Sequence, residues 1–388
     1  MLDTMTPEPH TAAPAGTGGP SSRARTWAGT MHGHDDEPAG QVRAHATGPS
    51  HLAPGAPLTR EQREDEEAAR LRPGATVARG AGERAVPEPP DPARTCFERD
   101  RDRIIHSSAF RRLAGKTQVV VYPTDHQRTR LTHALEVAQV ARSIAARVGA
   151  NVVLADAIAL GHDCGHGPGG HAAEDAFDAL LPDGFDHGPW GADVALASLN
   201  LCAPTLDGIR NHSWSRPAPA TVEGEIVSWA DRIAYCAHDL EDAIAAGIVS
   251  PDDLPGSLVD RCGVELRDQL RAFVDAVVDS TSQRGHVGMD ADTAAALAAL
   301  RAFNYERIYT RPESLAQAQA VITVLQGLVT WYAEHPDAPP ADFVRPDDPV
   351  GAAVTYVAGM TDRFAFDKAV ELLGWRPERL PKGIGHGA

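Results

Sequence analysis

Apolar residues recur at intervals of three and four positions through most of the chain after Phe97, and this spacing places them on one face of an α-helix. The clearest case is residues 128–149, where leucine, valine, isoleucine and alanine form a broad apolar face that ends at Gly149, a residue typical of helix C-termini. The next apolar run, residues 151–165, continues into the glycine-rich stretch GHDCGHGPGGH at 161–171. The pattern predicts two buried helices, the second of which leads into a loop.

Further segments carry the same helical period and are separated by loops rich in proline and glycine. They are residues 223–247, 259–280, 289–303, 313–334 and 349–373. The sequence contains neither the alternating pattern of half-buried strands nor a tandem repeat. We therefore expect an all-α protein with one helical domain over residues 91–388.

Residues 1–90 differ in composition from the rest of the chain. They are rich in glycine, proline, alanine, serine and threonine, and they contain few large apolar side chains. Such a segment cannot bury enough surface to offset the entropy lost on ordering, although the charged stretch 58–72 could form a transient helix. We expect residues 1–90 to be a disordered leader whose removal leaves the folding of the helical domain intact.

The overall charge and the cysteines restrict the class of protein. The 388 residues have a formal net charge of −17, which argues against a general nucleic-acid coat and against binding to anionic membranes. The five cysteines are scattered without a CxxC pair, so neither a disulfide framework nor a thiolate zinc site is expected. A signal peptide and an apolar run of about 18 residues are also absent from the sequence. We expect a cytoplasmic protein without membrane association.

The dipeptide His-Asp occurs at three places, residues 34–35, 162–163 and 238–239. Only His162 and Asp163 end an apolar helix and begin a glycine-rich loop, where small residues leave room for a bound group. This context makes the second dipeptide the candidate for chemistry.

Two further residues lie at comparable places in neighbouring helices. His133 is in the middle of the 128–149 segment, and Asp231 is in the middle of the 223–247 segment. If these helices pack together, two imidazoles and two carboxylates meet, a donor set that suits Mn²⁺, Mg²⁺, Fe²⁺, Ni²⁺ or Zn²⁺. From spacing alone, a structural histidine and a solvated helix charge remain open alternatives.

Long blocks of the sequence carry a resemblance to a known family. They are, in this order, FERDRDRIIHSSAFRRLAGKTQVV, RTRLTHALEVAQVA, GHDCGHGPGGHAAEDAF, GEIVSWADRIAYCAHDLEDAI and YVAGMTDRFAF, and the match around them extends from about Arg94 to about Gly374. Together they resemble the deoxyguanosine triphosphate triphosphohydrolase family of HD-domain metal phosphohydrolases. The resemblance implies an HD-domain helical fold and cleavage of a deoxynucleoside triphosphate to deoxynucleoside and tripolyphosphate, by water attack at the α-phosphate.

The resemblance also implies a metal site and a proton donor. His133, His162, Asp163 and Asp231 would hold one divalent metal, with Mn²⁺ or Mg²⁺ expected first and Fe, Ni, Co or Zn left open.

By the same resemblance, His171 would protonate the leaving 5′ oxygen, Glu174 would orient it, and His187 would be a second active-site histidine. His171 and Glu174 would share one face of a helix that begins after Gly170.

Charge indicates where phosphates would bind. Residues 94–130 contain nine basic and four acidic residues, a local excess that we expect to neutralise a triphosphate. Arg130 lies one helical turn before His133 and would reach phosphate oxygens beside the metal.

Sugar contacts are expected from a neighbouring helix. Tyr235 and Asp239 follow Asp231 by four and eight residues and therefore share its helix face. The resemblance implies that Tyr235 stacks on the deoxyribose, that Asp239 accepts from the 3′-hydroxyl, and that Gln118 also faces the sugar. A buried core tyrosine is the alternative for Tyr235.

Members of the family form oligomers, and many require a nucleotide or single-stranded DNA, so the resemblance implies a homo-oligomer with a dNTP or single-stranded DNA effector. Two other functions remain open: an HD phosphohydrolase for a nucleoside monophosphate or cyclic nucleotide, and a non-catalytic nucleotide sensor. The basic block favours a longer phosphate chain, and His171 with Glu174 argues against a pure sensor.

Overall fold

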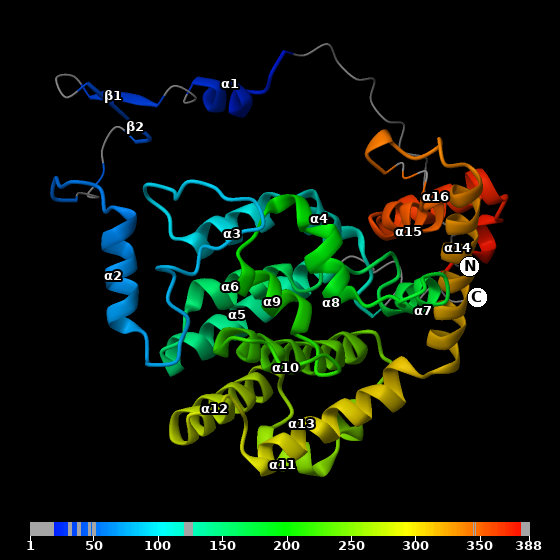
Figure 1. Cartoon of the computed structure of the whole chain (residues 1–388). Helices are drawn as coiled ribbons and strands as arrows, with labels where there is room; N and C mark the ends of the chain where they lie inside the picture. The colour runs from blue at the N-terminus through cyan, green and yellow to red at the C-terminus, as the bar shows by residue number, and fades with distance from the viewer. Residues whose placement is uncertain are drawn as a thin grey trace, which may run out of the picture. The chain divides into compact units, whose positions relative to one another are not determined.

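The computed structural model describes residues 19–29, 33–36, 40–45, 48, 52–119, 127–343, 345 and 347–381. The chain divides into two units, Met1–Pro57 and Leu58–Ala388. The described part of the first unit contains helix α1 (Ser22–Gly29) and an antiparallel pair of strands, β1 (His34–Asp36) and β2 (Gln41–Arg43) (Figure 1). These short elements lie in the segment that the sequence predicted to be disordered; residues 1–18, 30–32, 37–39, 46, 47 and 49–51 of that segment lie outside the described residues.

The second unit is built from helices. They are α2 (Arg60–Arg70), α3 (Cys96–His106), α4 (Ser108–Arg112), α5 (Arg130–Val148), α6 (Val152–Gly161), α7 (His171–Asp178), α8 (His187–Trp190), α9 (Ala203–Asn211), α10 (Val222–Ala245), α11 (Gly256–Cys262), α12 (Leu266–Arg284), α13 (Ala291–Asn304), α14 (Pro312–Glu334), α15 (Pro349–Ala358) and α16 (Asp362–Leu373). The prediction of an all-α fold is confirmed.

Two of the predicted helices are each divided in the structure. The 259–280 segment is broken at Gly263, whose φ of 81° is unfavourable for other residues, so α11 ends there and α12 follows. The 349–373 segment is broken before Thr361, whose side chain accepts a hydrogen bond from Phe364 N and caps α16. Apolar periodicity continues through both breaks, which is why the sequence predicted one helix in each case.

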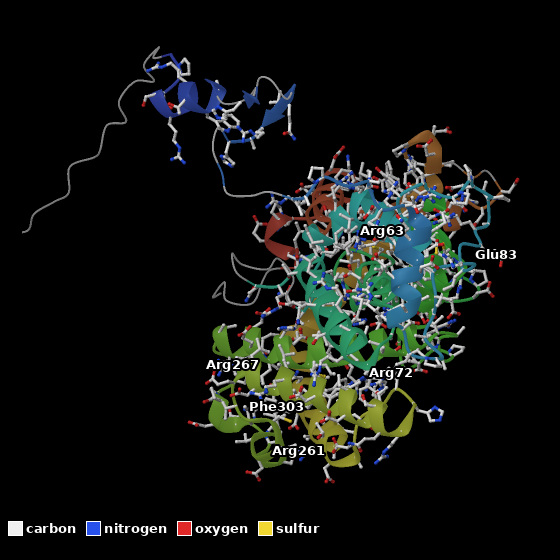
Figure 2. All side chains as sticks on the ribbon, turned by 90° about the vertical axis from the view of Figure 1, so that its left-hand side faces the viewer. Arg63, Arg72, Glu83, Arg261, Arg267 and Phe303 are labelled. Atoms are coloured by element: carbon white, nitrogen blue, oxygen red, sulfur yellow. The ribbon has the colours of Figure 1, made fainter. Side chains whose placement is uncertain are left out.

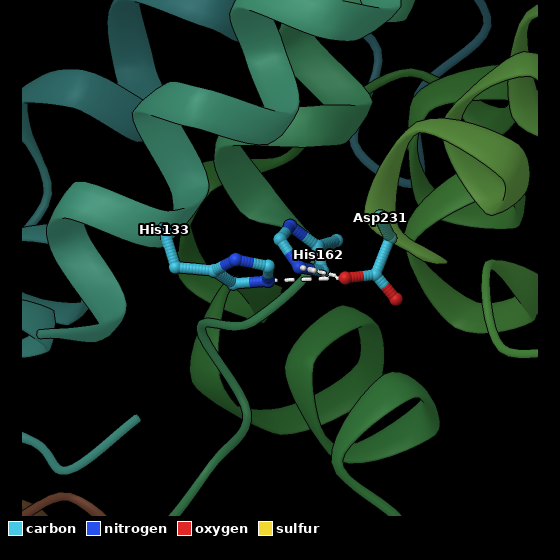
Figure 3. A group of neighbouring side chains, drawn as sticks. All are labelled: His133, His162 and Asp231. Carbon is cyan, nitrogen blue, oxygen red and sulfur yellow. Dashed lines mark hydrogen bonds and ion pairs between the residues drawn. The ribbon is translucent and has the colours of Figure 1, made fainter. Parts of the chain in front are cut away.

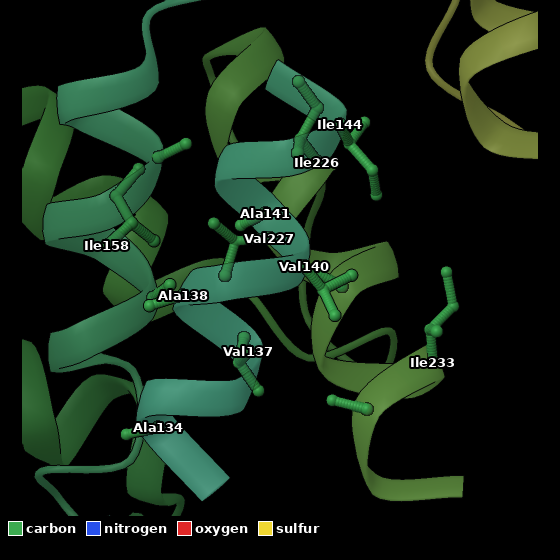
Figure 4. Close-up of a cluster of buried hydrophobic side chains, with 14 of the residues drawn as sticks. Ala134, Val137, Ala138, Val140, Ala141, Ile144, Ile158, Ile226, Val227 and Ile233 are labelled. Atoms are coloured by element: carbon green, nitrogen blue, oxygen red, sulfur yellow. The ribbon is translucent and has the colours of Figure 1, made fainter. Parts of the chain in front are cut away.

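The larger hydrophobic core forms where α5 packs between α6 and α10 (Figure 4). Alanines at 134, 138 and 141 on α5 allow close helix approach, and Ile144, Ile158 and Val227 fill the space between the helices. Each of these side chains is buried, and burial of each large aliphatic side chain stabilises the fold by roughly 1.5–3 kcal/mol. This packing fixes the relative positions of the three helices that carry His133, His162 and Asp231.

A second core joins α7 to the C-terminal helices α14, α15 and α16. Phe177 of α7, Leu328 of α14, Val357 of α15 and Phe366 of α16 are all buried in it. The connection between α6 and α7, residues 162–170, therefore leaves one core and enters the other. Its backbone position depends on both.

The prediction of a disordered leader is wrong for residues 58–90, because these residues belong to the helical unit. Figure 2 labels Arg63, Arg72 and Glu83 along this segment. α2 carries a capping box, and Glu67 on its buried side accepts a hydrogen bond from Ala78 N at 2.8 Å. The segment therefore has a fixed course along the helical unit.

Carboxylates and backbone groups hold this segment in place instead of a large apolar face. Thr76 donates its N–H and its hydroxyl to Glu223, at 3.1 and 2.7 Å, and Arg84 forms an ion pair with Asp100 at 2.7 Å. Glu223 and Asp100 are fully buried. Amino-acid composition could not predict this ordered segment, because hydrophobic content gives no information about hydrogen bonds and ion pairs to buried carboxylates.

Candidate active site

Two histidines and two aspartates meet at the junction of α5, α6 and α10. His133 lies on the buried face of α5, His162 directly follows α6, and Asp231 lies within α10. His133 Nε2 is 3.0 Å from Asp231 Oδ1, and His162 Nε2 is 3.7 Å from the same oxygen (Figure 3). Asp163 Oδ1 is 3.3 Å from His162 Nε2, and Asp163 Oδ2 is 4.0 Å from His133 Nε2. The structure thus brings together the four residues that the sequence grouped as candidate ligands.

The hydrogen bonding of His162 fits a metal ligand. Its Nδ1 lies 2.6 Å from the carbonyl oxygen of Ala159, which can only accept, so geometry assigns the ring proton to Nδ1. Its Nε2 then presents a lone pair to the cluster, and this buried atom has no hydrogen-bond partner within the described residues. A ring oriented by a backbone carbonyl in this way is typical of metal-binding histidines.

Arg130 is buried beside the cluster. One terminal nitrogen donates to Asp163 Oδ2 at 2.7 Å, whereas Nε and the other terminal nitrogen lack a hydrogen-bond partner in the described part of the chain. Burial alone would raise the pKa of Asp163, but the charges of Arg130, His162 and His166 together outweigh burial and hold this pKa well below its usual range. The remaining donors of Arg130 are therefore available to an anion next to the cluster.

A second group of histidines surrounds Glu174. α7 begins at His171, and Glu174 lies one turn further, with Oε2 3.5 Å from His171 Nδ1. Oε1 of Glu174 accepts a hydrogen bond from His187 Nδ1 and lies 3.6 Å from His166 Nδ1. His166 and His187 are buried and stacked with ring centroids 3.8 Å apart, whereas the His171 side chain is 73% exposed. Glu174 therefore adjoins three imidazoles, two of which are buried and one exposed.

His187 connects this group to the cluster of candidate metal ligands. Its Nε2 is 3.0 Å from His212 Nε2 and 4.0 Å from Asp163 Oδ1. His212 packs edge-on against His162, with ring centroids 4.9 Å apart. Burial alone would lower the pKa of His187, but the hydrogen bond and charge of Glu174 outweigh burial and raise it. The environment therefore favours a protonated ring beside the cluster.

Both groups face one cavity of about 490 Å³, a volume within the range of small-molecule sites. All the predicted site residues except His162 and Glu174 border this cavity. These two contact histidines that line it: His162 packs against His212, and Glu174 lies beside His171. Gln118 lies at its edge with a buried side-chain oxygen that lacks a partner among the described residues. The sequence therefore identified residues that converge on one cavity.

Tyr235 and Asp239 form a wall of the cavity together with residues of α13 and of the turn that follows it. Tyr235 Oη accepts a hydrogen bond from Arg301 Nε at 2.9 Å, and Tyr309 Oη donates to Asp239 Oδ2 at 2.6 Å. Burial raises the pKa of Asp239 to about 7. Tyr309 ends a π-helical turn, Tyr305–Tyr309, and such turns are frequent at functional sites. Both predicted sugar contacts therefore face the cavity.

A cationic region adjoins this wall. The Arg232 guanidinium lies 3.6 Å from the centre of the Trp214 ring, and Trp214 Nε1 donates to Ser228 O at 3.1 Å. Arg130, Arg232 and Arg301 all border the cavity. This part of the cavity thus offers positive charge on several sides.

The basic block at residues 94–130 does not supply this charge as predicted. Its arginines on α3 and in the preceding turn pair with acids such as Glu88, Asp91 and Asp102, and Arg128 pairs with acids of α10. Lys116 is buried, and its ammonium group donates hydrogen bonds to two backbone carbonyl oxygens. Of the nine basic residues, all within the described ranges, only Arg130 borders the cavity. Most of these arginines find acidic partners outside the block, so a surplus counted along the sequence does not measure charge at the site.

Sequence reasoning did not identify His166, His212, Arg232, Arg301 or Tyr309 as site residues. His166 follows Asp163 by three residues in the glycine-rich loop, and Arg232 directly follows Asp231, so their positions beside candidate ligands were available signals. The other residues lie in segments whose approach to the site depends on tertiary packing.

Comparison with known proteins defines the class. Residues 130–236 match the HD domain family model, and residues 287–371 match the model of the phosphohydrolase-associated domain. HD domains bind divalent metals, and the described residues contain a His/Asp cluster able to hold one.

Curated relatives narrow the class to one family. A deoxyguanosinetriphosphate triphosphohydrolase-like protein from Caldanaerobacter subterraneus subsp. tengcongensis is 40% identical over 323 residues, covering 81% of this chain and 95% of that protein. Proteins of the same description from Clostridium perfringens strain 13 (39% identity; 71% and 86% coverage) and Deinococcus radiodurans (35%; 82% and 100%) are also similar. The chain belongs to the deoxyguanosinetriphosphate triphosphohydrolase-like family of HD-domain hydrolases.

Two further predictions concern the cysteines and the cellular location. All five cysteines lie in the described part of the structure as free thiols, as expected. Among the described helices, none is both long and apolar enough to cross a bilayer. The expected location in the cytoplasm stays a prediction.

Proposed function

We propose that this chain hydrolyses a deoxynucleoside triphosphate at the α-phosphate and releases deoxynucleoside and tripolyphosphate. The observation that carries the proposal is the convergence, on one cavity, of a candidate metal cluster, a Glu174–histidine group and the guanidinium groups of Arg130, Arg232 and Arg301. A nucleotide with several phosphates matches this combination, because each group has a distinct part of that substrate to contact.

His133, His162, Asp163 and Asp231 would hold the divalent metal, for which Mn²⁺ or Mg²⁺ is our first choice. A divalent ion bound there supplies charge neutralisation at the phosphate and lowers the pKa of coordinated water. The pairing of Asp163 with Arg130 supports this role, because it keeps the carboxylate ionised in a buried position.

Arg130, with unpaired donors next to Asp163, would bind oxygens of the α-phosphate. Arg232 and Arg301 would neutralise the phosphates further along the chain. A triphosphate carries more charge than a monophosphate or cyclic nucleotide, so several guanidinium groups at one cavity favour the longer substrate.

His171 would donate the proton that the 5′ oxygen needs when it leaves. Glu174 would orient this ring, and it also favours the protonated form of His187: burial lowers the pKa of His187, but the hydrogen bond and charge of Glu174 raise it. The exposure of His171 allows its ring to turn into the cavity when substrate is bound.

Tyr235 would stack on the deoxyribose and leave no room for a 2′-hydroxyl, while Asp239 and Gln118 would contact its polar groups. Tyr235 is held by Arg301 and Asp239 by Tyr309, which supports a wall of defined shape. A homo-oligomer and activation by a dNTP or single-stranded DNA complete the proposal by analogy with the family.

The proposal is tested by incubating the purified chain with each dNTP and Mn²⁺ or Mg²⁺ and resolving tripolyphosphate, pyrophosphate and orthophosphate. Tripolyphosphate should appear with wild type and be lost in His162→Ala and Asp163→Ala. His34→Ala, which changes another His-Asp dipeptide outside the site, is the matched control and should retain activity. If no dNTP yields tripolyphosphate, even with mixed dNTPs or single-stranded DNA as activators, the sensor or the hydrolase of smaller nucleotides becomes the better description.

A further inference from the structure

The block YVAGMTDRFAF is not explained by the cavity, because its aspartate does not border it. Asp362 begins α16 and is buried, yet its carboxylate points at the active-site loop. Oδ1 accepts a hydrogen bond from Gly169 N at 2.8 Å, and Oδ2 accepts from both the N–H and the hydroxyl of Thr117. One carboxylate from the C-terminal helices thus connects two segments of the active site.

Lys116 makes a parallel connection next to it. Its buried ammonium group donates to the carbonyl oxygen of His166 and, at 3.0 Å, to the carbonyl oxygen of Ala358 at the end of α15. Lys116 and Asp362 therefore hold the active-site loop at both ends of the His166–Gly169 segment.

The turn held in this way has little freedom to move. Gly169 and Gly170 have φ angles of 76° and 65°, and α7 begins at the next residue, His171. A Cβ atom on Gly170 would lie 2.9 Å from the carbonyl oxygen of Thr117, so the loop backbone is pressed closely against the segment that Asp362 also holds. A shift of this turn would move the start of α7.

Three donors converge on Asp362, whose two carboxyl oxygens accept from all of them. An asparagine would direct its N–H₂ group at Gly169 N–H or at Thr117, leaving donors facing one another in a buried place. Asp362→Asn keeps the size of the side chain and removes this pattern of acceptance.

We propose that Asp362 is a positioning residue for proton donation to the leaving group: it fixes the Gly169–Gly170 turn and thereby places His171 and Glu174. This inference rests on the proposed function of that pair. The role is indirect, since Asp362 itself touches neither the cavity nor the candidate metal ligands.

The test compares a dNTP with the same dNTP in which sulfur replaces the bridging 5′ oxygen, because a thiolate departs without needing a proton. If Asp362 acts through the proton donor, Asp362→Asn should lower kcat on the normal substrate by about 10- to 100-fold and on the sulfur analogue by less than about threefold. Rate as a function of pH should lose the same limb as in Glu174→Ala.

A reference variant, Glu174→Ala, distinguishes failure of the proposed acid role from failure of the positioning role. Glu174→Ala removes the proposed orienting carboxylate and should show the same preference for the sulfur analogue. If Glu174→Ala slows both substrates equally, the proposed acid role is wrong. If Glu174→Ala is selective but Asp362→Asn slows both substrates equally, the positioning role is overturned while the acid role stands.

Glu223→Gln is the matched structural control. Glu223 is also a buried carboxylate that accepts from the N–H and hydroxyl of one threonine and from a distant backbone N–H, that of Asn151. The Glu223→Gln substitution should lower thermal stability and should change kcat on the two substrates by the same factor. A selective effect in Glu223→Gln would count against the proposal, because a general loss of stability would then explain both variants.

Thr117 keeps the proposal testable if Asp362→Asn does not fold. Thr117→Val removes only the hydroxyl donor to Asp362, and Thr117→Ser retains it. We expect a selective loss of about three- to tenfold in the valine variant and wild-type selectivity in the serine variant. Equal behaviour of the two variants would overturn the role of this contact.

Discussion

His187 Nε2 lies 3.0 Å from His212 Nε2, so one ring must donate a proton to the other. His212 Nδ1 lies 2.8 Å from the carbonyl oxygen of Ile209 and therefore carries the proton of that ring. Its Nε2 is then the acceptor, and His187 donates from Nε2 while its Nδ1 donates to Glu174. Together these contacts favour a doubly protonated His187 between a neutral histidine and a carboxylate.

This arrangement predicts a pH-dependent stability in the metal-free protein. The pKa of His187 is raised above its ordinary value near 6.5, so the stabilisation that Glu174 provides is fully present below that pH and is lost as pH rises through the folded pKa. The pKa of Glu174 is lowered despite burial, because His171 and His187 outweigh it, so its ionised form persists below pH 5. Urea unfolding of wild type and Glu174→Gln should differ most near pH 5–6 and least near pH 9. An equal difference at both ends would argue that His187 is neutral throughout.

Metal binding should appear in thermal stability without any reference to turnover. A ligand at about 100 times its Kd stabilises the folded state by about 2.7 kcal/mol, so Mn²⁺ should raise the Tm of protein first treated with EDTA. Asp231→Ala removes an oxygen donor from the cluster and should abolish most of this rise, whereas His34→Ala should retain it. The same rise in Asp231→Ala would place the ion elsewhere.

Trp214 should influence affinity for the phosphate chain through Arg232. The cation–π contact at 3.6 Å contributes about 1 kcal/mol, or roughly fivefold in binding. We expect Trp214→Leu to raise KM for a dNTP by about fivefold with kcat nearly unchanged, and Trp214→Phe to retain most of the affinity. Steady-state kinetics would show this split; a loss confined to kcat would instead place Arg232 at the reacting phosphate.

Truncation should distinguish the two N-terminal boundaries. Removing residues 1–57 leaves the contacts of α2, Thr76 and Arg84 intact, and the Tm should stay within a few degrees of the full chain. Removing residues 1–90 takes both Thr76 donors from Glu223 and the Arg84 charge from Asp100, and each buried carboxylate that loses such a partner costs about 1–3 kcal/mol. Thermal unfolding of the two truncated chains checks this directly, and equal Tm values would restore the original expectation of a dispensable 90-residue leader.

The helices and the candidate ligands could be predicted because they depend on local patterns. α5 and α10 have long apolar faces, and His133 and Asp231 lie inside quoted blocks that resemble one family. The pairing of Glu174 with His187 and the contact with His212 could not be predicted, because they depend on how the chain folds back after α7.

Charge and order were harder to predict from composition. Arg232 and Arg301 border the cavity because α10 and α13 pack together, whereas most arginines of the basic block find acidic neighbours. Residues 58–90 lack a large apolar face, and their order comes from a few buried carboxylates that no count of residue types reveals.

The hydrogen bond between Gly169 and Asp362 joins residues 193 positions apart, one in each of the two regions that match separate domain models. A chimaera that carried only the first region would keep every candidate metal ligand and lose an anchor of its active-site loop. A second region transplanted from another protein would therefore need a hydrogen-bond acceptor at the place of Asp362, within reach of both Thr117 and Gly169.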